Sequence, residues 1–275
     1  MAMKSKDLYP GIFSRHAEAY QQRLDQVMLR GEARGRMRVL ELVDARAGMR
    51  VLDLACGPGT LSAALATAVA PGGEVVGVDL APGMIQRARA RGLANARFEV
   101  MDIERLAFPD ASFDAATCGH GLQFVPHLDQ ALREARRVLG AGRRFAASIP
   151  VGSPGQGVQD LLDSVIDRLL PPAPRAIDQD DTRKTLSDPD SLAEAARRAG
   201  FATARVEVVE EKVVWQSADQ LVTMLASWWD CAARLEGVGE PTRRSFIAEA
   251  AEVLRRDHPG AIETASRNLV LLAIA

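Results

Sequence analysis

The chain has 275 residues, of which 47% are hydrophobic and 25% are charged, a composition that is ordinary for a globular protein. Its 34 basic and 36 acidic residues give a formal net charge of −2, which leaves no general cationic field. Because phosphate neutralisation supplies most of the affinity for nucleic acids, we expect no nucleic-acid partner. No apolar run reaches the roughly 18 residues that would span a bilayer, and we expect no membrane span.

The three cysteines, Cys56, Cys118 and Cys231, are far apart and form no CxxC pair. This spacing argues against a disulfide framework and against a zinc site, so we expect no metal. It also fits a reducing compartment, and no signal peptide is apparent after Met1. We therefore expect a cytoplasmic protein.

Residues 1–47 carry apolar side chains at helical spacing and are expected to form helices. From Gly48 onward, short apolar strands alternate with helices. The strands are expected at 51–55, 74–80, 96–102, 113–119 and 144–149, and the helices between them at 60–70, 82–91 and 129–139. Nearly continuous apolar strands in strict alternation with helices predict a parallel, doubly wound sheet that is covered on both faces.

After Pro150 this alternation ends. We expect a helix at 158–170, a surface loop at 171–184, a helix that ends before Gly200, a strand at 205–215, helices at 218–235 and 241–257, and a final strand at 268–275. In the helix at 218–235, Trp228 falls on the apolar stripe and is expected in the core. Trp229 lies off the stripe and is expected to face a pocket or a subunit partner.

The stretch VLDLACGPGT, residues 51–60, ends an apolar strand in a glycine turn. In open α/β sheets, ligands bind beyond the carboxyl ends of the strands. Gly57 and Gly59 would let the backbone approach a ligand, and the helix that begins near Thr60 presents free N–H groups. Asp79 ends the next strand, 20 residues after Gly59, where a carboxylate can accept both hydroxyls of a ribose.

Two classes of cofactor fit this turn. The dinucleotide fingerprint G-x-G-x-x-G requires a third glycine, but Ser62 stands at that position. Asp53, inside the strand, adds a negative charge beside the turn. That charge suits a cofactor with an ammonium and a sulfonium better than one with two phosphates. The electrostatics therefore favour S-adenosylmethionine over NAD.

Four segments together resemble the motifs of class I S-adenosylmethionine-dependent methyltransferases. They are VLDLACGPGT, VVGVDLAPGMIQRARAR, MDIERLAFPDASFDAATC and ALREARRVLGAGRRF, in this order and spacing. The likeness is strongest to the ubiquinone/menaquinone-biosynthesis-like C-methyltransferases and related small-molecule methyltransferases. It implies an α/β fold: a Rossmann-like, seven-stranded sheet with helices on both faces and the last strand antiparallel. It also implies an N-terminal helical lid at 1–47, a cofactor-binding core at 48–150, and acceptor-pocket helices, including a lid insertion, with the final strands at 151–275.

The resemblance also implies where the cofactor binds. Asp53, Gly57 and Gly59 would surround its methionine part, and Asp79 would bind the ribose hydroxyls.

The adenine site follows from the same resemblance. Leu80 and Met84 would pack on the adenine, Ile103 would flank the ring, and Asp102 would accept a hydrogen bond from the exocyclic amine.

Gly119, His120 and Gln123 would lie near the methionine end. Methyl transfer is an in-line displacement, so the protein mainly positions the acceptor. A base is needed only if the acceptor must lose a proton, and histidine is the usual candidate. His120 is our first candidate catalytic residue and His16, in the expected lid, is the second. Tyr20 is expected to close over the cofactor and completes this set.

The leading hypothesis is transfer of the sulfonium methyl to a carbon or oxygen of a small hydrophobic acceptor, with S-adenosylhomocysteine as product. The apolar helix at 158–170 favours an aromatic, isoprenoid or similar specialised metabolite. Three alternatives stay open: C-methylation of an alkene coupled to cyclisation, S-adenosylmethionine binding without methylation, and an NAD-dependent oxidoreductase. A homo-oligomer is also left open.

Overall fold

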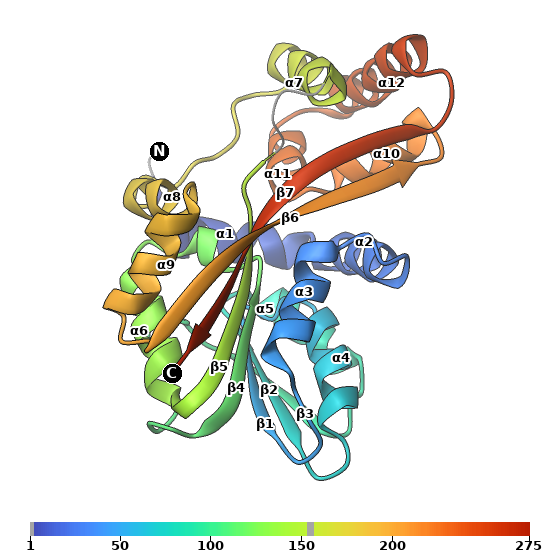
Figure 1. Ribbon diagram of the computed structural model, residues 1–275. Coiled ribbons are helices and arrows are strands. Elements are labelled where there is room, and N and C mark those ends of the chain that lie inside the picture. Colours follow the sequence, from blue (N-terminus) through green and yellow to red (C-terminus); the bar gives the residue numbers. More distant parts are fainter. Residues whose placement is uncertain (1–2, 153–156) are drawn as a thin grey trace.

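Seven strands form one sheet at the centre of the molecule (Figure 1). The computed structural model describes residues 3–152 and 157–275. The sheet order is β3-β2-β1-β4-β5-β7-β6, with β7 antiparallel to both of its neighbours. The strands are β1 (Arg50–Leu54), β2 (Glu74–Asp79), β3 (Ala96–Val100), β4 (Phe113–Gly119), β5 (Leu139–Pro150), β6 (Thr203–Trp215) and β7 (Ile262–Ile274). The predicted seven-stranded α/β sheet with an antiparallel last strand is confirmed.

Helices cover both faces of the sheet and extend beyond one end of it (Figure 1). They are α1 (Ser5–Arg15), α2 (Ala17–Leu29), α3 (Arg34–Val43), α4 (Thr60–Val69), α5 (Pro82–Ala90), α6 (Leu128–Val138), α7 (Gly157–Leu169), α8 (Asp180–Leu186), α9 (Pro189–Arg198), α10 (Ala218–Ala226), α11 (Trp229–Glu236) and α12 (Glu240–Asp257), with a 3₁₀ turn η1 (Leu122–Phe124).

Successive side chains of each strand point to opposite faces of the sheet, so each strand packs against helices on both faces. In β1, Val51 packs with α3 and α4, whereas Leu52 packs on the opposite face with α6 and α9. Both side chains are fully buried, as expected for parallel strands that are covered on both faces. The chain leaves β1 for β2 on one side and later returns to β4 on the other, so the topological switch point lies at the end of β1.

The last two strands form a long hairpin that projects past the sheet. β6 and β7 pair over their whole length, but only Asn268–Ile274 of β7 also pairs with β5. The projecting half carries α7, α10, α11 and α12, which bury a second apolar cluster around Phe246 and Leu254 (Figure 1).

Several predicted bounds after Pro150 are wrong. The final strand begins at Ile262 rather than 268, because its polar first half is paired with β6. The helix predicted at 218–235 breaks between α10 and α11, which leaves Trp228 42% exposed instead of in the core. The predicted loop at 171–184 contains the start of α8. Residues 1–2 of the expected lid and 153–156 of the expected acceptor segment lie outside the described residues.

Within the expected lid at 1–47, α3 packs on β4, β5 and β7 as part of the sheet's cover. Only α1 and α2 lie over the ends of the strands. No helix in the described part of the chain is long and apolar enough to cross a membrane. Across the same residues, no three His, Cys, Asp or Glu side chains are grouped so that they could hold a metal ion.

Candidate active site

A cleft opens at the carboxyl ends of the central strands, beneath α1 and α2. It encloses about 950 Å³, including its open mouth. Its walls come from the turns after β1, β2, β3 and β4. The lining includes most of the residues predicted from the sequence: Tyr20, Asp53, Gly57, Asp79, Leu80, Met84, Asp102, Ile103, Gly119 and His120.

Asp79 shapes the glycine turn in addition to lining the cleft. Its Oδ2 accepts the N–H of Gly57 at 2.9 Å, and its Oδ1 accepts the N–H of Ala81 at 2.8 Å. Gly57 has a φ of 55°, and a Cβ placed there would meet nothing within 4 Å. Burial raises the pKa of the Asp79 carboxyl, although the two N–H groups act in the opposite direction. A carboxylate has about four acceptor sites, so Asp79 keeps capacity for ligand hydroxyls.

Asp53 is a buried carboxylate that has hydroxyl partners but no cation. Its Oδ2 accepts from Ser62 Oγ at 2.6 Å and its Oδ1 from Thr117 Oγ1 at 2.8 Å. Burial raises the pKa of Asp53 to about 6, against the effect of these hydroxyls. No basic side chain in the described part of the chain forms an ion pair with it. A cationic group of a ligand would therefore favour its ionised form.

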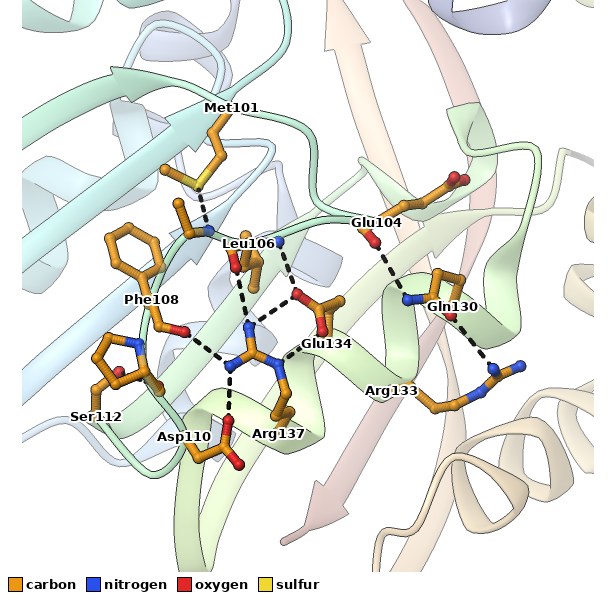
Figure 2. A network of polar contacts seen from close by, with 12 residues as sticks. Met101, Glu104, Leu106, Phe108, Asp110, Ser112, Gln130, Arg133, Glu134 and Arg137 are labelled. Carbon is orange, nitrogen blue, oxygen red and sulfur yellow. Dashed lines mark hydrogen bonds and ion pairs between the residues drawn. The ribbon is translucent and has the colours of Figure 1, made fainter.

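The loop between β3 and β4, which carries Asp102, is anchored to α6 (Figure 2). Arg137 donates hydrogen bonds to the carbonyl oxygens of Leu106 at 3.0 Å and Phe108 at 2.7 Å. Glu134 accepts the N–H of Leu106 at 2.7 Å, and its bonds to Arg137 lower the pKa of its carboxyl. Two adjacent turns of α6 thus fix the loop from which the predicted adenine contacts arise.

Replacement of Arg137 by methionine should lower the free energy of unfolding by about 2 kcal/mol, because the loop loses several charge-assisted hydrogen bonds at once. Urea denaturation measures this loss. Arg133→Met is the matched control, since Arg133 lies one turn away in α6 and its only bond in Figure 2 is a 3.3 Å contact with Gln130. It should change stability by less than about 0.5 kcal/mol. Equal losses in the two variants would show that Arg137 does not anchor the loop.

His120 follows β4 in the left-handed region, with a φ of 64°, which is uncommon for a residue with a side chain. Its N–H donates to the carbonyl of Ser148 at 2.9 Å, and its own carbonyl accepts from Gln123 Nε2 at 2.9 Å. Burial lowers the pKa of the imidazole well below its usual value, and the charge of Arg36 adds to this effect. His120 is therefore neutral near pH 7, and its buried Nε2 has no partner among the described residues.

Two arginines that the sequence analysis did not select lie beside His120. Arg36 of α3 lines the cleft, is 7% exposed, and donates from Nη2 to Tyr20 Oη at 3.1 Å. Arg23 of α2 stacks on the indole of Trp228, with its Cζ 4.4 Å from the ring centroid. Arg36 and the neutral imidazole of His120 line the cleft, and Arg23 lies against the ring of Tyr20, close enough for its charge to act on both.

The first helix is fastened across the cleft by charge and by close packing. Lys6 Nζ lies 2.6 Å from Asp102 Oδ2 and 2.5 Å from Glu104 Oε2. On the α5 side, the N–H of Gly83 donates to Ser14 Oγ at 3.1 Å. A Cβ on Gly83 would lie 2.6 Å from the carbonyl oxygen of Ser14, so only glycine allows this approach.

Aromatic side chains line the cleft under α1. The ring of Phe124 packs edge-on against those of Tyr9 and Phe13, with centroids 5.0 Å apart in each pair. Trp229 packs edge-on against Tyr9 at 5.3 Å, behind this wall. The cleft therefore has a polar end near β1 and β4 and an aromatic side near the N-terminus.

Three residues predicted from the sequence do not line the cleft. A Cβ on Gly59 would lie 3.2 Å from Ala88 Cβ, so this glycine allows α4 to pack close to α5. His16 Nε2 lies 2.8 Å from Glu236 Oε1, at the junction between α1 and α2. Gln123 Nε2 donates to the backbone carbonyl of His120. The roles predicted for these three residues in ligand contact find no support in this geometry.

The donor set of the cleft fits the groups of S-adenosylmethionine. Asp53 offers the ammonium a carboxylate that has hydroxyl partners but no ion-pair partner among the described residues. Arg36 has a buried Nε without a hydrogen-bond partner, which suits the carboxylate of the cofactor. Asp79 retains acceptor capacity for ribose hydroxyls, and Met84 and Ile103 present apolar surface for a flat ring.

Comparison with known proteins is consistent with this site. A family model described as "Methyltransferase domain" matches residues 51–142. Nocamycin O-methyltransferase from Saccharothrix syringae is 32% identical over 232 residues, which cover 79% of this chain and 81% of that protein. The 2-phytyl-1,4-naphtoquinone methyltransferase from Synechococcus elongatus is 38% identical over 153 residues. That match covers 53% of this chain and 65% of the relative, so the chain spans less than two thirds of it.

The fold is shared with solved structures. The YcgJ protein from Bacillus subtilis superimposes with a TM-score of 0.56 at 20% identity, over 88% of this chain and 97% of that one. At this identity the likeness shows the fold alone. The long match with an O-methyltransferase supplies the family: this chain belongs to the class I S-adenosylmethionine-dependent methyltransferases.

Proposed function

We propose that the chain transfers the methyl group of S-adenosylmethionine to a carbon or oxygen of a small, largely hydrophobic acceptor. The observation that supports this most directly is the composition of the cleft, in which cofactor-type polar groups meet an aromatic wall. S-adenosylmethionine, when bound, supplies an electrophilic methyl group. The protein's own residues then have to bind, orient and exclude water.

The cofactor would be held at three points of the sheet. Asp79 would accept the ribose hydroxyls, Asp53 would face the ammonium, and Arg36 would bind the carboxylate. Asp102 is the candidate for the adenine amine, and Lys6 already bridges it to the first helix. Closure of α1 over the cleft would then depend on the same carboxylate that recognises the base.

The acceptor would lie against the aromatic wall of Tyr9, Phe13 and Phe124. Aromatic side chains bury large apolar areas and prefer such edge-on arrangements, so a hydrophobic ring or chain suits this wall. His120 lies at the other end of the cleft, where its free Nε2 can hydrogen-bond the acceptor. The match with an O-methyltransferase supports oxygen as the methylated atom.

The packing of α1 on α5 can be tested through Gly83. Gly83→Ala should weaken S-adenosylhomocysteine binding about fivefold, mainly through faster dissociation, because the new Cβ displaces Ser14 and with it α1. Stopped-flow measurement of the dissociation rate checks this. The melting temperature should fall little, since alanine favours the helix of α5 by about 1 kcal/mol over glycine.

Gly157→Ala is the matched control, because Gly157 begins α7 and a Cβ there would meet nothing within 4 Å. Its dissociation rate should equal that of the wild type. An unchanged rate in Gly83→Ala would mean that α1 does not retain the cofactor.

The proposed function is tested first by calorimetric titration with S-adenosylmethionine, S-adenosylhomocysteine and NADH in parallel. We expect micromolar affinity for the first two and none for NADH. Incubation with hydrophobic acceptors and mass spectrometry should then detect a product heavier by one methylene unit. Cofactor binding without any methylated product would favour the alternative of a non-methylating protein, and binding of NADH alone would reject the proposal.

A further inference from the structure

Positive charge gathers at the cleft wall without a matching carboxylate: Arg36 lines the cleft, and Arg23 packs against Tyr20 of the same wall. Nε of Arg36 and Nη1 of Arg23 are both buried and lack hydrogen-bond partners. Arg23 is close enough to Arg36 and His120 for its charge to act on both. In the part of the chain that the structure describes, neither arginine has a carboxylate within 4 Å. Asp53, the buried carboxylate on the cleft wall, is engaged with two hydroxyls instead.

Arg23 is fixed in this place. Its guanidinium lies 4.4 Å from the ring centroid of Trp228 and 5.3 Å from that of Tyr20, so both rings would lose a cation–π contact if it turned to solvent. Burial lowers the pKa of Arg23 to about 10, which still leaves it charged at neutral pH. A charged group whose inner nitrogen is buried without a hydrogen-bond partner is unfavourable, so an anion that enters from outside would stabilise this arrangement.

S-adenosylmethionine brings one carboxylate, and Arg36 on the cleft wall suits it. We propose that Arg23 binds a second anion, an ionised oxygen of the acceptor, while the acceptor's apolar body lies against Tyr9, Phe13 and Phe124. This inference rests on the proposed function and narrows its acceptor to a hydrophobic acid, either a carboxylic acid or an acidic enol, that is methylated at that oxygen.

The chemistry of the site agrees with an acceptor that is already ionised. The acceptor oxygen forms a bond to the methyl carbon while the carbon–sulfur bond breaks and its electron pair goes to sulfur. The oxygen anion becomes a neutral ester or enol ether, and no proton is released. The pKa of His120 lies well below its usual value, so the neutral imidazole is a weak base. Methylation of an acceptor that is already an anion requires no base. His120 would instead hydrogen-bond the acceptor through Nε2.

The test is calorimetric binding of matched acids and neutral analogues to protein saturated with S-adenosylhomocysteine. The probes are 2-naphthoate against 2-naphthamide, and the enolate of 5,5-dimethylcyclohexane-1,3-dione against its methyl enol ether. We expect the wild type to bind at least one acid tenfold or more tightly than its neutral analogue. Comparison of the affinities for 2-naphthoate and for the enolate shows whether the site prefers a carboxylate or an enolate oxygen.

In Arg23→Met this preference should vanish, while the affinity for S-adenosylhomocysteine changes by less than twofold. Its melting temperature should be equal to or above that of the wild type, because an unpaired buried charge is replaced by an apolar side chain of similar length. A role of Arg23 in packing alone would give a lower melting temperature instead. Arg30→Met is the matched control, since Arg30 directly follows the last residue of the same helix and pairs with Glu32 at the surface; it should keep the preference for acids.

Three results would overturn the inference. In the first, no acid binds or neutral analogues bind as well as acids. In the second, Arg23→Met keeps the preference. In the third, Arg23→Met loses S-adenosylhomocysteine, which would assign Arg23 to the cofactor. If the wild type did not bind S-adenosylhomocysteine at all, the proposed function itself would fail, and the experiment would show this before any acid was added.

Discussion

Replacement of Asp79 by asparagine should weaken S-adenosylhomocysteine binding at least 100-fold. The carboxylate accepts the N–H groups of Gly57 and Ala81 with its two oxygens, and we propose that it also accepts the ribose hydroxyls. Asparagine has one acceptor oxygen and turns its NH₂ group toward one of these N–H donors. A lost bond to a charged acceptor costs about 1.5–3 kcal/mol, so the loss of such a bond from each of the two ribose hydroxyls exceeds the roughly 2.8 kcal/mol that corresponds to two powers of ten. Calorimetric titration measures the loss.

A second ligand separates the two roles of Asp79. The wild type should bind S-adenosylhomocysteine much more tightly than its 2′-deoxy analogue, whereas Asp79→Asn should bind the two almost equally. Asp114→Asn is the control, because Asp114 also accepts a backbone N–H, from Arg50 at 3.0 Å, but at the opposite end of β1. If Asp79→Asn kept the full discrimination against the deoxy analogue, Asp79 would act only on the glycine turn.

The elements that could be predicted are those whose signals lie within a short stretch of sequence. β1 to β4 and α4 to α6 follow from short apolar runs, glycine turns and helical spacing, each read within about ten residues. The residues at the strand ends followed from the same reading, because parallel strands bring their carboxyl ends to one edge. Asp53, Asp79 and His120 were therefore found on the cleft wall without any knowledge of long-range contacts.

Features that depend on distant partners were missed. The first half of β7 is polar and is a strand only because β6 pairs with it across the hairpin. Arg36 was not selected from the sequence, although it precedes Val39 by three positions and Val43 by seven, and both valines are buried. That helical spacing was a usable sign that this arginine faces inward.

Arg23 carried a weaker sign. It is three positions after Tyr20 in α2, a spacing that places it next to the apolar stripe rather than on it. Its burial depends on Trp228, a residue more than 200 positions away that the helix break after α10 brings over it. No local pattern contains that contact.

Affinity for S-adenosylmethionine should fall about tenfold between pH 7.5 and pH 5. Burial raises the pKa of Asp53 to about 6, so about nine tenths of this carboxyl is protonated at pH 5 in the free protein. We propose that the ammonium of the cofactor binds the ionised form, and protonation would remove that partner. The raised pKa of Asp79 acts in the same direction. Calorimetric titration across this range measures the slope.

Asp53→Asn should bind S-adenosylmethionine about 10- to 100-fold more weakly at pH 7.5, because it loses a hydrogen bond to a charged group, and its affinity should change less with pH.

The effect of Asp53 on stability changes with pH in the opposite direction to its effect on binding. The folded protein holds the Asp53 proton more tightly than the unfolded chain, so without cofactor this group makes the fold less stable as pH rises from about 4 to 6, by about 3 kcal/mol in total. The cofactor should therefore raise the melting temperature more at pH 7.5 than at pH 5. An affinity that stayed level from pH 7.5 to 5 in the wild type would show that the carboxylate of Asp53 does not meet the ammonium, and that the cation is recognised elsewhere in the cleft.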